Sequence, residues 1–178
     1  MTDPTNPSTP TQSERSELVA LLDKHRGLFL HTAQGLTDEQ ARLTPTVSTL
    51  SIGGLIKHVT ATCEQWLDFV EHGAPEQDVD WEALDEAAYQ AFANGFTLLP
   101  GETLEGVQQA YAEVAARANE MVQTVDLDAG NTLPKAPWFE NGSWSNRRVF
   151  VHLVAETAQH AGHADIIRET IDGQQTMA

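Results

Sequence analysis

The chain has 178 residues, a formal charge of −16 at pH 7 and a single cysteine, Cys63. This length suits one domain with its own core, and a lone cysteine excludes an internal disulfide and a cysteine-rich zinc site. The acidic charge disfavours binding to nucleic acid and to anionic membranes.

The composition predicts one domain over residues 13–173, between a disordered lead-in at 1–12 and a short tail at 174–178. The lead-in is rich in Pro, Thr and Ser, and it lacks the basic start and apolar stretch of a secretory signal. No apolar run reaches membrane-spanning length. We therefore expect a cytoplasmic protein.

Two helices are predicted in the first quarter of the domain. Leucines recur at helical spacing from about Ser13, and Gly35 closes this first helix. A short helix then opens at Thr37, where Gln40 completes a capping-box pattern, and Pro45 ends the segment.

Three further segments follow in the middle of the chain. Ser51 is the predicted N-cap of a second long helix, which runs to about His72. Residues 73–101 lose the helical period, so we expect a long connection with room for one short helix. A third long helix is predicted from Thr103 to about Thr124, where apolar residues again recur at three and four.

The last long helix follows a loop that is rich in glycine and proline. This loop covers residues 126–143; Ser145 then caps a helix that runs to about Ile171 and stops at Gly173. No segment has a convincing strand pattern. The expected fold is therefore all-α, a four-helix bundle with long connections between helices two and three and between helices three and four.

The last predicted helix carries a stripe of possible metal ligands: His152, Glu156, His160 and His163. At about 100° and 1.5 Å per residue, the stripe lies within about 80° of one face and is about 16 Å long. Only adjacent members can therefore share one ion, and any such pair needs a further ligand. His58, in the second predicted helix, is the obvious donor.

Two other interpretations of this stripe remain open from the residues alone. The four side chains can form a solvated polar face, or they can form a buried hydrogen-bond network. A metal ion is a third possibility, because imidazole and carboxylate groups on an inward face are costly without partners.

Two segments resemble a known superfamily. The pairing of GGLIKHVTATCEQW with ETAQHAGHADIIRE is similar to the DinB/YfiT-like superfamily of metalloenzymes. More narrowly, it resembles the actinobacterial branch with mycothiol-dependent S-transferases and mycothiol-dependent maleylpyruvate isomerase. The resemblance runs from about Ser13 to Gly173, and AGHADIIRETIDG is its most specific part. It implies a four-helix bundle that holds a divalent ion.

The resemblance also implies a ligand set. The second-helix histidine of the family corresponds to His58, and matching the family glycine to Gly162 places two more ligands at His160 and Glu156. Many members have histidine where Glu156 stands, although the maleylpyruvate isomerase branch also has glutamate there.

His163 is the second departure from the common family pattern, because it stands where many members have glutamine. It makes His160 with His163 a rival ligand pair. If Glu156 and His160 are the ligands, His152 and His163 become candidates to orient them or to bind substrate.

Two imidazoles and one carboxylate leave positions open on a divalent ion, as in catalytic sites. Zinc is the default expectation, with nickel, iron or manganese as alternatives. An open ion can hold a thiol as thiolate, and the resemblance implies a low-molecular-weight thiol such as mycothiol as co-substrate.

The leading interpretation is a thiol S-transferase that acts on a small electrophile in detoxification or stress defence. The first alternative is a metal-dependent hydrolase, and the second is a stress-linked binding protein whose metal is structural or absent. A homodimer fits bundles of this kind, although the sequence shows no exposed heptad seam.

Weaker signals concern substrate binding and the cysteine. Trp138 and Trp144 precede or begin the last helix, where they can anchor the loop or line the substrate mouth. Arg168 can form an intrahelical pair or receive a substrate carboxylate. Cys63 lies about 140° around the helix from His58, so we expect a core residue rather than a ligand.

Overall fold

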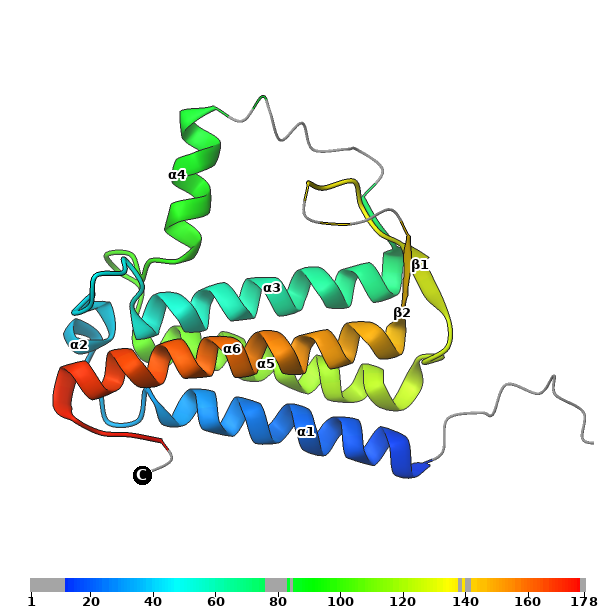
Figure 1. Cartoon of the computed structure of the whole chain (residues 1–178), viewed down its shortest axis with the longest axis horizontal. Helices are drawn as coiled ribbons and strands as arrows, with labels where there is room; N and C mark the ends of the chain where they lie inside the picture. The colour runs from blue at the N-terminus through cyan, green and yellow to red at the C-terminus, as the bar shows by residue number, and fades with distance from the viewer. Residues whose placement is uncertain (1–11, 76–82, 84, 138, 140–141, 177–178) are drawn as a thin grey trace, which may run out of the picture.

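The computed structural model is a bundle of long helices, which run side by side in Figure 1. It describes residues 12–75, 83, 85–137, 139 and 142–176, so most of the expected lead-in, Trp138 and residues 177–178 lie outside this part. The predicted all-α class is confirmed. The long helices are α1 (Gln12–His31), α3 (Ile52–His72), α5 (Leu104–Thr124) and α6 (Asn146–Asp172), and the short ones are α2 (Asp38–Arg42) and α4 (Glu86–Gly95).

The helices begin where the predicted capping residues stand. Thr37 accepts a hydrogen bond from the Gln40 backbone N–H, and the Gln40 side chain accepts one from the Thr37 N–H, which completes the capping box. Ser51 and Ser145 each accept a bond from the backbone N–H three residues later. The predicted helix starts are therefore confirmed to within a residue or two.

One hydrophobic core joins the four long helices. The main packing contacts join α1 with α6, α3 with α5, and α3 with α6. Among the described residues, no helix is both long and apolar enough to cross a membrane. The largest fully buried side chains include Leu22, Phe29, Ile52, Leu55, Leu67, Tyr111, Phe150 and Leu153.

A small antiparallel sheet was not expected from the sequence, and the prediction of no strand is wrong. β1 (Gly130–Thr132) pairs with β2 (Ser143–Ser145), with Gly130 opposite Ser145. Strands of three residues are too short for an alternating pattern, so their pairing depends on tertiary contacts. A Cβ on Gly130 would lie 2.1 Å from the Trp144 carbonyl oxygen, which explains the glycine.

This sheet is attached to the end of α3. The Asn131 side chain donates a hydrogen bond to the Phe69 carbonyl oxygen in the last turn of that helix, at 2.7 Å. Because β2 leads directly into α6, the attachment fixes the start of α6 beside the end of α3. It also places Trp144 at the α3–α6 interface.

The other end of α3 is covered by the chain that follows α4. Figure 1 shows α4 standing away from the bundle before the chain returns to it. A Cβ on Gly54 would lie 1.9 Å from the Phe96 carbonyl oxygen, and one on Gly53 would lie 2.8 Å from a Leu98 methyl group. The adjacent glycines therefore allow residues 96–98 to lie directly on α3, one turn before His58.

We expect Gly54→Ala to destabilise the protein by about 1–3 kcal/mol, because the new methyl group must displace the Phe96 backbone. Gly27→Ala is the matched control: it is also helical, and a Cβ there meets no atom within 4 Å. In the control, the higher helix propensity of alanine should raise the free energy of unfolding by about 0.5–1 kcal/mol. Urea denaturation followed by circular dichroism measures both, and equal stability changes in the two variants would contradict the close approach.

Candidate metal and substrate site

The packing of α3 against α6 brings three of the predicted ligands together. The His58 ring of α3 and the His160 ring of α6 have centroids 5.0 Å apart and meet edge to face. Glu156 Oε2 lies 3.6 Å from His160 Nε2. The other oxygen, Oε1, lies 3.4 Å from His152 Nε2, so the carboxylate stands between two histidines of its own helix.

His163 has a different position. Its ring centroid lies 5.6 Å from that of His160, and its side chain is exposed to solvent. Glu156, in contrast, lies close enough to His58 to act on its pKa. The structure therefore places Glu156 with His58 and His160, and it leaves His163 at the outer edge of the group.

The protonation states in this group suit metal ligands. Desolvation, followed by the nearby His160, lowers the His58 pKa to about 4, so His58 is neutral at pH 7. The Glu156 pKa is also lowered, mainly by its contact with His160 and despite partial burial. A neutral imidazole and an ionised carboxylate are the forms that coordinate a metal.

The donor types fit a divalent ion, although the side chains do not yet converge. In the described part of the chain, no three His, Cys, Asp or Glu side chains are already grouped so that they could hold an ion. His160 Nδ1 is nevertheless buried without a hydrogen-bond partner among the described residues, which is uncommon for a buried nitrogen. His58, Glu156 and His160 lie near one another without converging on one point. Binding of one ion by all three would therefore require rotation of their side chains.

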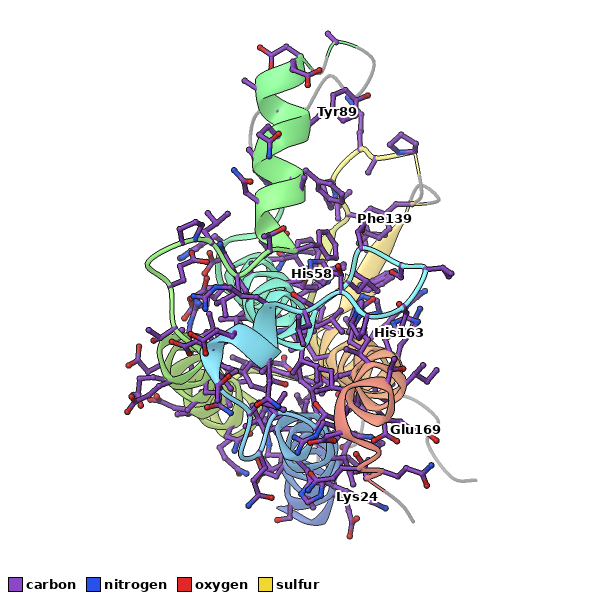
Figure 2. The ribbon with its side chains drawn as sticks, turned by 90° about the vertical axis from the view of Figure 1, so that its left-hand side faces the viewer. Lys24, His58, Tyr89, Phe139, His163 and Glu169 are labelled. Carbon is purple, nitrogen blue, oxygen red and sulfur yellow. The ribbon has the colours of Figure 1, made fainter. Side chains whose placement is uncertain are left out.

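Phe96 covers one face of His58. The two rings stack with centroids 3.9 Å apart and planes 21° apart. Figure 2 shows α4, which precedes Phe96, rising above His58. Sequence reasoning missed Phe96 because it lies in a connection without a clear pattern; the adjacent glycines of GGLIKH were the available signal.

An aromatic cluster, formed by Trp66, Phe139, Trp144 and His152, lies next to Glu156. The two indoles stack in parallel, with centroids 4.8 Å and planes 5° apart. The His152 ring meets both of them, at 5.0 Å from Trp66 and 5.1 Å from Trp144. The Phe139 ring centroid lies 5.9 Å from that of each indole. In Figure 2, Phe139 lies on the same side of the bundle as α4.

Trp144 contacts His152, which in turn contacts Glu156, and its role in substrate binding stays a prediction. Trp138, its predicted companion, lies outside the described residues. Trp66, on α3, stacks on Trp144. Its role in the cluster depends on the β1–β2 pairing, which the sequence did not indicate.

Two comparisons with known proteins bear on the family and the fold of the chain. Residues 17–173 match the family model described as Mycothiol-S-transferase. The chain belongs to this family. No match to a curated protein was found.

A solved structure supports the fold of this mycothiol-S-transferase family member. The protein described as the conserved protein of locus from Enterococcus faecalis superposes with a TM-score of 0.65 at 14% sequence identity. The match covers 90% of this chain and 98% of that one. At this identity the likeness concerns the fold alone.

Arg168 forms an intrahelical ion pair with Asp172, which was one of the two roles predicted for it, and it also bonds to the chain after α1. Its side chain is buried, with 3% of its surface exposed. The guanidinium donates to Asp172 within α6 and to the carbonyl oxygens of Thr32 and Gln34 after α1, at 2.8 Å each. A bond to a fourth partner reaches Gln174. These bonds satisfy carbonyl groups at the end of α1, so the arginine ties two helices together.

Cys63 is a core residue, as its position relative to His58 predicted. Its side chain is buried, and this burial raises the pKa of the thiol to about 12. The thiolate is the reactive form of cysteine, so Cys63 is inert at neutral pH. A transfer reaction in this family member therefore needs a thiol from outside the chain.

We expect Cys63 in the native protein to resist Ellman's reagent at pH 8, because a pKa of about 12 leaves only about one thiol in 10,000 ionised. The same protein unfolded in guanidinium chloride should react completely within minutes. Absorbance of the released thionitrobenzoate measures both rates. Rapid and complete labelling of the folded protein would show that Cys63 is accessible, contrary to this structure.

Proposed function

We propose that the protein is a divalent-metal-dependent transferase that joins a low-molecular-weight thiol, such as mycothiol, to a small electrophile. The supporting observation is the juxtaposition of His58 from α3 with Glu156 and His160 from α6. Membership of the mycothiol-S-transferase family favours a thiol as the co-substrate. Hydrolysis by activated water would use the same ligands, and it is an outcome of the tests below.

His58, Glu156 and His160 would hold the ion, with zinc first and nickel, iron or manganese as alternatives. When bound, the ion lowers the pKa of a coordinating thiol and supplies a thiolate at neutral pH. His152 contacts the Glu156 oxygen that faces away from His160 and so orients the carboxylate. Phe96 holds the plane of the His58 ring by stacking.

The overall reaction is a substitution or an addition at carbon. In a substitution, a sulfur–carbon bond forms, the bond from that carbon to the leaving group breaks, the leaving group departs as an anion and the thiol proton passes to solvent. In an addition, a π bond at the reacting carbon breaks instead, and its electron pair takes up a proton from solvent in place of the one that the thiol released. The aromatic cluster would bind the apolar part of the electrophile beside Glu156, because large partly exposed rings favour contact with apolar ligands.

We expect His58→Ala and His160→Ala each to weaken zinc binding by at least about 100-fold, because each removes one of three protein ligands. His72→Ala is the matched control, since its side chain is 75% exposed at the end of α3. Titration against a zinc indicator dye measures the affinities. Less than about a tenth of an equivalent of metal in the wild-type protein after reconstitution would refute the metal site.

The third ligand is decided by a pair of variants. We expect Glu156→Gln to lose most of the zinc affinity and His163→Ala to retain it, because the partly buried Glu156 carboxylate contacts His160 whereas the His163 side chain is exposed. The same indicator titration applies. Retained affinity in Glu156→Gln together with loss in His163→Ala would transfer the role to His163.

We expect metal- and thiol-dependent conjugation of 1-chloro-2,4-dinitrobenzene by the reconstituted protein, with mycothiol included in the thiol panel. Chelation should abolish the acceleration, and added zinc should restore it. Absorbance of the thioether measures the rate above the uncatalysed background. Acceleration that needs metal but no thiol would indicate hydrolysis, and no acceleration under any condition would leave a binding protein.

A further inference from the structure

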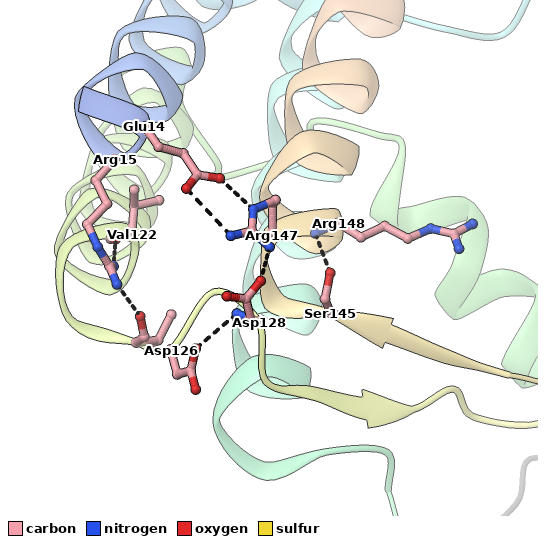
Figure 3. Close-up of polar contacts among 9 residues, drawn as sticks. Glu14, Arg15, Val122, Asp126, Asp128, Ser145, Arg147 and Arg148 are labelled. Atoms are coloured by element: carbon pink, nitrogen blue, oxygen red, sulfur yellow. Dashed lines mark hydrogen bonds and ion pairs between the residues drawn. The ribbon is translucent and has the colours of Figure 1, made fainter. Parts of the chain in front are cut away.

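The guanidinium groups of the arginines differ in their hydrogen-bond and ion-pair partners. Within the described residues, Arg148 makes no hydrogen bond or ion pair through its guanidinium; only its backbone N–H is bonded, to Ser145. Figure 3 shows the contrast with the adjacent Arg147, which binds Glu14 and Asp128, while the Arg148 side chain points the other way. The remaining arginines, all with bonded guanidinium groups, are Arg15, Arg26, Arg42, Arg117 and Arg168.

Arg15 and Arg42 also have no carboxylate partner among the described residues, but both donate to backbone carbonyl oxygens, whereas the Arg148 guanidinium makes no such bond. The chain has 26 Asp and Glu residues against 10 Lys and Arg, and Arg117 and Arg147 each bind two carboxylates. The acidic surface also repels anions in general. A negatively charged ligand would therefore need a local cation, and Arg148 is exposed and available.

Stacking on Trp144 fixes Arg148 in a form that suits a planar anion. The Arg148 Cζ atom lies 4.3 Å from the centre of the Trp144 ring. The guanidinium therefore lies over the indole ring, and the N–H donors along its edge make no hydrogen bond within the described residues. A carboxylate matches that edge with two parallel hydrogen bonds, and prior stacking reduces the entropy lost on binding.

Arg148 also lies on the same face of α6 as the proposed metal ligands Glu156 and His160. Arg148, His152, Glu156 and His160 follow one another at intervals of four along α6. Arg148 lies close enough to His152 to contribute to the lowering of its pKa. Arg148 contacts Trp144, and His152 contacts both stacked indoles and the Glu156 carboxylate, so the aromatic cluster adjoins both the guanidinium and the carboxylate.

The dimensions suit a small molecule with an acid at one end. Eight residues of α6 separate Arg148 from Glu156, which is about 12 Å along the helix. Both side chains are long, so a substituted benzoate can reach from one to the other. Its ring would lie against Trp66 and Trp144.

We propose that Arg148, held on Trp144, binds the carboxylate of the electrophilic substrate, and that the natural acceptors are small conjugated or aromatic acids. This assignment rests on the proposed transferase function and adds the substrate class to it. The carboxylate pairs with Arg148, the apolar body contacts the aromatic cluster, and the reacting carbon points toward His58, Glu156 and His160.

The first test measures binding without catalysis. The full-length protein is titrated in the presence of a chelator, so that no carboxylate can bind an ion, with 4-nitrobenzoate and with the neutral 4-nitrobenzamide. We expect at least about 5-fold tighter binding of the benzoate by calorimetry, because a charge-assisted pair is formed. Arg148→Gln should bring the two affinities together, and Arg148→Lys should keep part of the difference.

Lys24→Gln is the control for loss of one positive charge. Lys24 is exposed on α1, and Figure 2 shows it on the opposite side of the bundle from His58. This variant should keep the preference for the benzoate. Equal affinities in the wild-type protein, or an unchanged preference in Arg148→Gln, would overturn the assignment.

The second test uses turnover with 4-chloro-3,5-dinitrobenzoate and 4-chloro-3,5-dinitrobenzamide as acceptors. We expect the benzoate to have a KM at least about 5-fold lower, and we expect Arg148→Gln to raise that KM selectively. Preferential binding without turnover of either acceptor would contradict the transferase function and leave the carboxylate site standing. A preference that follows a carboxylate on the thiol instead of the acceptor would overturn the assignment to the electrophile.

Discussion

The contact between α3 and α6 is the constraint on which the site depends. These helices run in opposite directions in Figure 1, so that His58 near the start of α3 meets His160 in the later half of α6. Contacts at both ends of α3 support this packing. The β1–β2 sheet bonds to the end of α3 through Asn131, and residues 96–98 lie on its start over Gly54. Because the core fixes the helix axes, His58, Glu156 and His160 need only side-chain rotation to approach one another more closely.

Two groups of side chains follow each other along one face of α6. Partial burial keeps the His58 imidazole neutral while Glu156 stays ionised, which prepares the ligand group for a cation. One turn earlier, His152 joins this group to the aromatic cluster, where apolar contact is available. Arg148 begins the same line and presents a positive charge. In the proposed function, metal binding and substrate recognition would thus share α6 but use different residues.

The sequence was sufficient where the physical signal is local. Helical periodicity and capping residues such as Ser51 and Ser145 placed the helices, and a spacing of four predicted that Glu156 and His160 share a face. Non-local contacts were not accessible in the same way. Phe96 stacks on His58, but it lies in a connection without helical periodicity. The buried Arg168 donates to a carbonyl oxygen just after the end of α1, more than 130 residues earlier in the chain. Neither contact leaves a pattern in its own segment.

The central claim is that His58, Glu156 and His160 converge on one divalent ion that keeps a position open for a thiol. A crystal structure of the zinc-loaded protein with bound thiol, with anomalous data on both sides of the zinc absorption edge, tests it most directly. The account predicts one anomalous peak bonded to these three side chains, about 2.0–2.2 Å from their donor atoms, with the thiol sulfur in the remaining position. A peak bonded to His160 and His163 without Glu156, or no peak between α3 and α6, would contradict it.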